Sequence, residues 1–274
     1  MFRVAAAVIA LPVLLVILTQ DFQIFAELTH KLTGHSGPYN PPPPGSNAAD
    51  FFTTTEDGYR IHFRRWAPAS PAQSSLRVAI LSHGNAGTMD DYHTIPKWLA
   101  AKGIATYVYD YRGYGLSNGW PSERGLYKDI DAIWAEAVRR DQATPKTTLA
   151  FGHSLGAGPA SYLAEKLQLA VLLTAATYTS VPERVALHPL FGALAPFVWT
   201  RFPNRDRIAN LNNTCLIVLH AGQDESMPLS MSRSLLSSYK GSNRALFAAH
   251  PTATHASIVS LVPNLAEPLL PQCQ

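Results

Sequence analysis

The chain has 274 residues, of which 47% are hydrophobic and 15% charged, and its formal net charge at pH 7 is +3. This is enough for one large globular domain with a buried core. Lys and Arg are scattered along the chain, so no basic run predicts a nucleic-acid partner. No Cys and His residues have the spacing of a zinc site, and we predict no metal.

The first 28 residues are expected to form a signal-anchor or a signal peptide. An apolar run from Val4 to Leu18 follows Arg3. It is shorter than the roughly 20 residues that span a bilayer comfortably, but no small-residue cleavage site follows it. We therefore favour an uncleaved single-pass membrane anchor over a protein secreted after cleavage. The positive charge before the run places the large domain on the non-cytosolic side.

Residues 29–49 are rich in Pro and Gly and include the sequence NPPPPGSN. Such a composition is typical of an extended tether. The main domain is predicted to cover residues 50–274.

Strand-like and helix-like runs alternate along this domain. Residues 51–66 predict an antiparallel hairpin with its turn at Asp57–Gly58. The apolar, β-branched runs that follow predict strands at 77–84, 104–113, 147–154, 170–178, 214–222 and 244–250. Helical spacing predicts helices at 88–103, 121–140, 155–167 and 229–240. This alternation predicts an α/β fold in which a mostly parallel sheet carries helices on both faces.

The sequence GHSLG at 152–156 follows a predicted strand and precedes a predicted helix. In that context G-x-S-x-G marks a sharp turn that exposes a nucleophilic serine, here Ser154. Side chains at Gly152 and Gly156 would clash in such a turn, and Gly158 is expected to allow the helix to pack closely on a strand. A glycine-rich turn with an incidental serine is the alternative.

A serine hydroxyl needs a base that is oriented by an acid, and in this arrangement the acid and then the histidine follow the serine along the chain. Asp224 follows one predicted strand and His255 the next, so both are expected at the same rim of the sheet as Ser154. Glu225 and His250 are the alternative acid and base. Asp110 precedes the serine, and we expect it to anchor its loop through hydrogen bonds.

Two backbone N–H groups are expected to stabilise a negatively charged oxygen. Leu155 begins the helix after the serine, and Asn85 lies in the loop after the first central strand. Ala86 is the alternative donor in that loop. His83, just before it, is expected to be structural.

The segments LSHGNAG, DYRGYGLSNG, GHSLGAG, HAGQDESMP and ATHAS resemble, in order, the motifs of the α/β-hydrolase superfamily, from about residue 78 to 257. They are most similar to the membrane-anchored α/β-hydrolase-domain proteins, which include lipid and acyl-protein hydrolases. The resemblance implies the α/β-hydrolase fold, the triad Ser154–Asp224–His255, and hydrolysis of esters or thioesters without a cofactor. The chain departs from the pattern at Ala221, where glycine is usual, and at Ala256 after the histidine.

Alternative functions remain open from the sequence. A serine peptidase of the same fold usually carries a gating propeller domain, for which this chain has no room. A membrane-tethered interaction protein that kept a hydrolase fold is the non-catalytic alternative. The acyl chain, the leaving group and the oligomeric state are left open.

Residues 180–212 are expected to form a small cap over the sheet. Their apolar side chains either line an acyl-chain groove or touch a membrane, or else pack over the sheet edge; these are Leu187, Leu190, Phe191, Phe197, Val198 and Trp199. The two cysteines also leave two interpretations. Cys215 lies in an apolar run as a small core residue, or it pairs with Cys273 if the domain lies outside the cytosol.

Overall fold

The computed structural model describes Ile24 and residues 39–71, 74–189 and 192–273. The predicted anchor, apart from Ile24, and residues 29–38 of the predicted tether lie outside these ranges. Within them, no helix has both the length and the apolar character needed to cross a membrane.

The described chain forms one eight-stranded sheet with the order β1-β2-β4-β3-β5-β6-β7-β8. The strands are β1 Ala48–Thr54, β2 Arg60–Trp66, β3 Val78–Ser82, β4 Ala105–Tyr109, β5 Thr148–His153, β6 Val171–Ala175, β7 Cys215–Ala221 and β8 Ala245–His250. Strand β2 is antiparallel to both β1 and β4, and all other neighbours are parallel. The mostly parallel sheet and its antiparallel opening hairpin are therefore confirmed.

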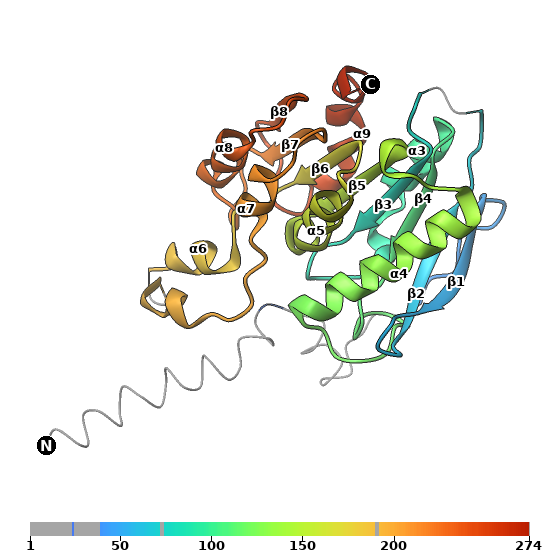
Figure 1. Cartoon of the computed structure of the whole chain (residues 1–274), viewed down its shortest axis with the longest axis horizontal. Coiled ribbons are helices and arrows are strands. Elements are labelled where there is room, and N and C mark those ends of the chain that lie inside the picture. The colour runs from blue at the N-terminus through green and yellow to red at the C-terminus, as the bar shows by residue number, and fades with distance from the viewer. Residues whose placement is uncertain (1–23, 25–38, 72–73, 190–191, 274) are drawn as a thin grey trace, which may run out of the picture.

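Helices cover both faces of this sheet (Figure 1). The α-helices are α3 Thr94–Ala101, α4 Glu123–Asp141, α5 Ala157–Leu167, α6 Val181–Ala186, α7 Asn204–Ala209, α8 Leu229–Ser238 and α9 Ile258–Ala266. Short 3-10 helices are η1 Met89–Tyr92, η2 Pro145–Thr147, η3 Ser154–Gly156, η4 Gly192–Phe197 and η5 Leu270–Cys273. The segment 88–103, predicted as one helix, is divided into η1 and α3.

Two apolar layers hold the helices to the sheet. On one face, α4, α5, α7 and α8 pack against side chains such as Ile80 and Tyr107. On the other face, α3 and α9 pack against side chains such as Leu81 and Val108. Consecutive residues of β3 and β4 thus point into opposite layers, because side chains alternate along a strand. A sheet covered on both faces exposes its loops at the strand ends, where the candidate site lies.

The segment between β6 and β7 departs from these layers. Its helices α6 and η4 extend away from the sheet (Figure 1). Leu187, Phe197 and Trp199 are 55%, 56% and 49% exposed, whereas Val198 is buried in the core. Leu190 and Phe191 lie outside the described residues. Of the two interpretations of these apolar side chains, packing over the sheet applies to Val198. The other three described side chains remain about half exposed to solvent.

Cys215, the first residue of β7, forms a disulfide with Cys273 in η5. The partners are 58 residues apart in sequence, and their Cα atoms are 5.5 Å apart. Cys215 is fully buried, so it is both a core residue and half of a cross-link. The pairing left open by the sequence is thus present in the structure.

Candidate active site

Ser154 lies at the sharp turn between β5 and α5. Its φ is +50°, a left-handed conformation that is uncommon for a residue with a side chain. The turn brings the chain very close to itself: a Cβ at Gly152 would lie 2.5 Å from the Cα of Ala157, and one at Gly156 would overlap the carbonyl oxygen of Ser82. The predicted reason for both glycines is confirmed. A strained turn of this kind is typical of a nucleophilic serine, and Ser154 is 5% exposed.

The imidazole of His255 lies between Ser154 and Asp224. Its Nε2 is 2.9 Å from Ser154 Oγ, and its Nδ1 is 3.0 Å from each carboxylate oxygen of Asp224. His255 follows β8 and Asp224 follows β7, so the parallel register of these strands carries both loops to the rim where Ser154 turns. The structure therefore brings together the three side chains that the sequence selected.

Asp224 is held as a carboxylate. Its side chain is fully buried, and its Oδ1 accepts hydrogen bonds from the backbone N–H groups of Ser226 at 2.8 Å and Met227 at 2.7 Å. Burial opposes the charged form, but the contact with His255 and these two N–H donors outweigh it, so the pKa of Asp224 is lowered. A carboxylate that is ionised at neutral pH next to Nδ1 leaves Nε2 free to accept a proton.

The two alternative residues lie elsewhere. Glu225 is exposed, and its carboxylate is 3.4 Å from the backbone nitrogen of His255 rather than from the imidazole. His250 ends β8 with its Nδ1 buried and without a hydrogen-bond partner among the described residues. Neither contacts the hydroxyl of Ser154 in the described hydrogen bonds.

The candidate oxyanion donors lie on two loops that are packed together. Gly156 contacts the carbonyl groups of Ser82 and His83, which places the turn that contains Leu155 against the loop that contains Asn85. Leu155 is buried, Asn85 is partly buried, and Ala86 is exposed. The close approach of these loops fits a shared pocket for a negatively charged oxygen.

Gly158 has a different role from the predicted one. A Cβ there would overlap the ring of Phe202, in the segment between η4 and α7. The absence of a side chain therefore allows this part of the cap segment to pack on α5, so the neighbour of Gly158 is Phe202 rather than the predicted strand. Aromatic residues of the cap segment could not be assigned a partner from sequence pattern alone.

Sequence reasoning missed Tyr92 and the role of His153. The hydroxyl of Tyr92, at the end of η1, lies 2.8 Å from the backbone nitrogen of Gly84 and 2.6 Å from Nδ1 of His153. Nε2 of His153 lies 3.0 Å from the backbone oxygen of His255. The only sequence signal for His153 is its position between Gly152 and Ser154, and Tyr92 has none, because its partners are 8 and 61 residues away.

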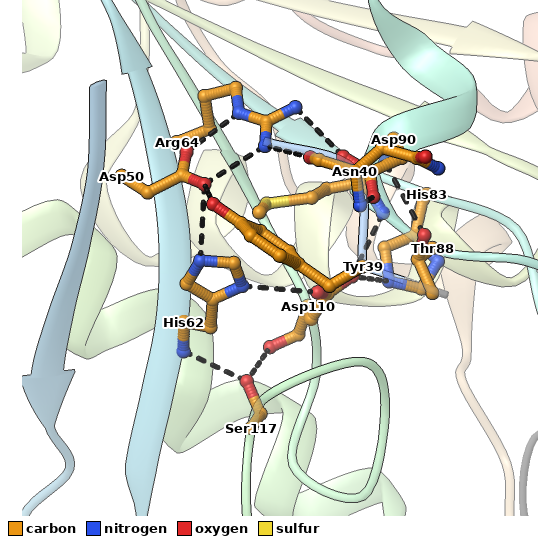
Figure 2. Close-up of polar contacts among 11 residues, drawn as sticks. Tyr39, Asn40, Asp50, His62, Arg64, His83, Thr88, Asp90, Asp110 and Ser117 are labelled. Carbon is orange, nitrogen blue, oxygen red and sulfur yellow. Dashed lines mark hydrogen bonds and ion pairs between the residues drawn. The ribbon is translucent and has the colours of Figure 1, made fainter. Parts of the chain in front are cut away.

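Asp110 belongs to a buried polar cluster next to the same loop (Figure 2). Its Oδ1 accepts a hydrogen bond from the backbone N–H of Met89 at 2.8 Å, which fixes the start of η1. Its Oδ2 is 3.5 Å from Nδ1 of His62. Its Oδ1 is 3.7 Å from Nε2 of His83, which is fully buried and packed on Tyr111. Both Asp110 and His83 thus have the structural setting that the sequence predicted.

The cluster continues to the opening hairpin. Arg64 donates to Asp50 at 2.6 and 2.9 Å, to Asp90 at 2.7 Å, and to the carbonyl of Asn40 at 2.7 Å. Tyr39 donates to Asp50 at 2.6 Å. Residues 39 and 40, within the predicted tether, are therefore attached to the domain through charge-assisted hydrogen bonds (Figure 2).

His62 makes the stability of this cluster depend on pH. Burial disfavours its charged form, but the facing carboxylates of Asp110 and Asp50 outweigh burial, so the pKa of His62 is raised. The guanidinium of Arg64 binds the same carboxylate of Asp50 from the side away from His62. Protonated His62 therefore contributes to the free energy of unfolding. This contribution is fully present below the pKa of the unfolded state, about 6.5, and it is lost as the pH rises through the raised pKa of the folded state. We expect the difference in free energy of unfolding between wild type and His62→Gln to be larger at pH 6 than at pH 9.

Urea unfolding at several pH values measures this difference. His93→Gln, at an exposed histidine between η1 and α3, is the matched control. A difference between wild type and His62→Gln that stays constant from pH 6 to 9 contradicts the assignment of the raised pKa to His62.

Comparisons with known proteins agree with this architecture. Residues 73–216, more than half of the chain, match the model of the family described as serine aminopeptidase, S33. The chain is 32% identical over 183 residues to alpha/beta hydrolase domain-containing protein 17B of Xenopus laevis, a match that covers 66% of this chain and 60% of the frog protein. It thus spans less than two thirds of that relative. It is also 28% identical over 219 residues to the Escherichia coli protein YfhR, with 76% of this chain and 73% of that protein covered.

Solved structures show the same fold. An esterase of Pyrococcus furiosus superposes with a TM-score of 0.68 at 13% identity, covering 87% of this chain and 94% of the esterase. Est1E of Butyrivibrio proteoclasticus, solved with ferulic acid bound, gives a TM-score of 0.65 at 19% identity over 80% of this chain and 98% of Est1E. At these identities the likeness concerns the fold alone.

Proposed function

Since the chain belongs to the serine aminopeptidase S33 family of the α/β-hydrolase superfamily, we propose that it is a serine hydrolase that cleaves carboxylic ester or thioester bonds. The observation that carries the proposal is the hydrogen-bonded series Ser154–His255–Asp224, in which the serine sits on a strained turn. A nucleophile within 2.9 Å of a base that an acid orients is the arrangement that acyl transfer needs.

In the first half of the proposed reaction, Ser154 attacks the acyl carbon of the substrate. Nε2 of His255 takes the hydroxyl proton as the new oxygen–carbon bond forms. The carbonyl oxygen becomes negatively charged, and the N–H groups of Asn85 and Leu155 stabilise it. When the tetrahedral intermediate collapses, the bond to the leaving alcohol or thiol breaks, and the imidazolium returns the proton to that leaving group.

In the second half, water releases the acyl group from the enzyme. His255 takes a proton from the attacking water, whose oxygen bonds to the acyl carbon. The bond to Ser154 Oγ then breaks, and the proton passes to the serine. Asp224 stabilises the imidazolium in both halves while it stays ionised. These steps need only side chains, backbone N–H groups and water.

The cap supports an acyl or lipid substrate. Leu187, Phe197 and Trp199 remain half exposed on the segment that extends from the sheet. Apolar surface of this kind can take up an acyl chain or lie against a lipid surface. We assign the cap segment 180–212 to substrate selection on this basis.

We also propose that the domain works outside the cytosol, attached to a membrane by its apolar N-terminal segment. The Cys215–Cys273 disulfide supports an oxidising compartment, because such bonds are rare where glutathione and thioredoxin keep thiols reduced. The apolar run from Val4 to Leu18 supports the attachment.

A fluorophosphonate probe tests the central proposal. We expect wild-type protein to react with it at a single site, identified by mass spectrometry on the peptide that contains Ser154. A series of p-nitrophenyl esters of increasing acyl length, the matching thioesters and an aminoacyl p-nitroanilide then define the bond that is cleaved. Hydrolysis of esters or thioesters supports the proposal, and a preference for the anilide favours a peptidase. No labelling of folded protein contradicts it and favours the non-catalytic alternative.

A further inference from the structure

One buried hydrogen-bond chain joins the three loops of the candidate site. It runs from the N–H of Gly84, in the loop after β3, to the hydroxyl of Tyr92, then to His153, the last residue of β5, and ends at the backbone carbonyl of His255. Tyr92 is 3% exposed and His153 6% exposed, so water does not compete for these bonds. Its ends are backbone atoms, which side-chain replacement elsewhere leaves in place.

The hydrogen bonds of this series all donate in one direction, from Gly84 toward His255. A backbone N–H can only donate, so the Tyr92 oxygen accepts from Gly84. A backbone carbonyl can only accept, so Nε2 of His153 carries a proton that it donates to His255. A neutral imidazole then has no proton on Nδ1, and that nitrogen accepts the hydroxyl proton of Tyr92. Every donor and acceptor along the chain is matched.

This arrangement requires His153 to be neutral, and its surroundings keep it so. Burial, followed by repulsion from His255, lowers the pKa of His153 to about 4. Burial also raises the pKa of Tyr92, which keeps its hydroxyl protonated. At neutral pH the hydrogen-bonded series of Tyr92 and His153 therefore has a single protonation state.

Three members of this hydrogen-bond chain adjoin groups of the proposed reaction. Gly84 precedes Asn85, His153 precedes Ser154, and the carbonyl acceptor belongs to His255 itself. Gly84 is packed closely against both side chains: a Cβ there would lie 3.0 Å from Nδ1 of His153 and 3.3 Å from the hydroxyl of Tyr92. Tyr92 is fixed in turn, because it ends η1, whose start Asp110 holds.

We propose that Tyr92 and His153 are positioning residues that fix the oxyanion loop, the nucleophile and the base relative to one another. The inference rests on the proposed serine hydrolase function, because it assigns these two side chains to the geometry of that reaction. Displacement of a reacting group by about 1 Å can lower the rate roughly 100-fold. An oxyanion donor acts mainly in the transition state, so the loss falls on kcat rather than on KM.

Variants of both residues test the inference with the p-nitrophenyl ester that wild type hydrolyses fastest. Tyr92→Phe removes only the hydroxyl, and we expect kcat to fall roughly 10- to 100-fold with KM nearly unchanged. The matched control is Tyr239→Phe, which removes a hydroxyl bonded to the carbonyl of Thr214, just before the amino end of β7. We expect kcat of that control to equal that of wild type.

Replacements of His153 separate positioning from space filling. His153→Leu fills the space with an apolar side chain but removes both hydrogen bonds, and we expect a fall in kcat similar to that of Tyr92→Phe. His153→Gln retains an N–H donor and an oxygen acceptor, and we expect it to recover most of the activity. In the double variant Tyr92→Phe/His153→Leu the losses should not multiply, because both changes break the same chain.

Each outcome decides between the two claims. An active wild type with unchanged kcat in Tyr92→Phe, or losses that multiply in the double variant, overturns the inference and leaves the proposed function intact. A folded wild type that hydrolyses no ester or thioester overturns both. Independently of activity, ¹⁵N spectra of the histidines should show His153 as the neutral Nε2–H tautomer from pH 5 to 8, and the charged form in that range also overturns the inference.

Discussion

Ser154→Ala is expected to lower kcat for ester hydrolysis roughly 10⁶-fold, to the level that binding and the oxyanion donors alone sustain. The hydroxyl that lies 2.9 Å from Nε2 of His255 is removed, while the Cβ and the strained turn remain. Steady-state kinetics and fluorophosphonate labelling measure the loss. The variant should still bind substrate, so KM, where it can be measured, should change little.

Ser260→Ala is the matched control for this variant. Ser260 is exposed on α9 and its hydroxyl contacts only the backbone of Ser257 among the described residues. Its kcat should equal that of wild type. If Ser154→Ala kept more than a few per cent of the activity, another group would have to be the nucleophile.

Asp224→Asn is expected to lower kcat roughly 10⁴-fold. The carboxylate accepts from Nδ1 of His255 with both oxygens at 3.0 Å. An amide in its place can present an N–H to Nδ1, which moves the imidazole proton to Nε2. That nitrogen then faces Ser154 with a proton and cannot act as a base.

Glu225→Gln is the control in the adjacent position. Glu225 is exposed and lies near the backbone nitrogen of His255, so its loss should change kcat by no more than about threefold. If Glu225→Gln is the more damaging of the two variants, the assignment of the acid is wrong. Kinetics of both variants at one pH, with thermal unfolding as a check on folding, provide the comparison.

The three proposed catalytic residues could be predicted from the sequence because their positions depend on local hydrophobic patterns. Ser154, Asp224 and His255 each follow an apolar run that is recognisable as a buried strand. Parallel strands bring their carboxyl ends to one edge whatever their order in the sheet. The sequence therefore indicated the meeting of these residues without indicating the order of the eight strands.

Features that depend on the path of loops could not be predicted in the same way. Tyr92 reaches His153 because residues 88–103 divide into η1 and α3, and helical spacing alone favoured one continuous helix. Gly158 contacts Phe202 because the cap segment returns over α5 after η4. Cys273 reaches Cys215 because α9 and η5 bring the end of the described chain back to the start of β7. No hydrophobic periodicity and no sequence motif predicts any of these contacts.

The disulfide also separates the three proposed catalytic residues into two inside the loop that it closes and one outside. Asp224 and His255 both lie between Cys215 and Cys273, inside a closed loop of chain, whereas Ser154 lies outside it. In the unfolded chain the cross-link limits the conformations available to this loop. The distance by which the acid and the base can separate there is therefore bounded by a closed loop with a sequence separation of 58 residues, whereas Ser154 is joined to them only through the main chain.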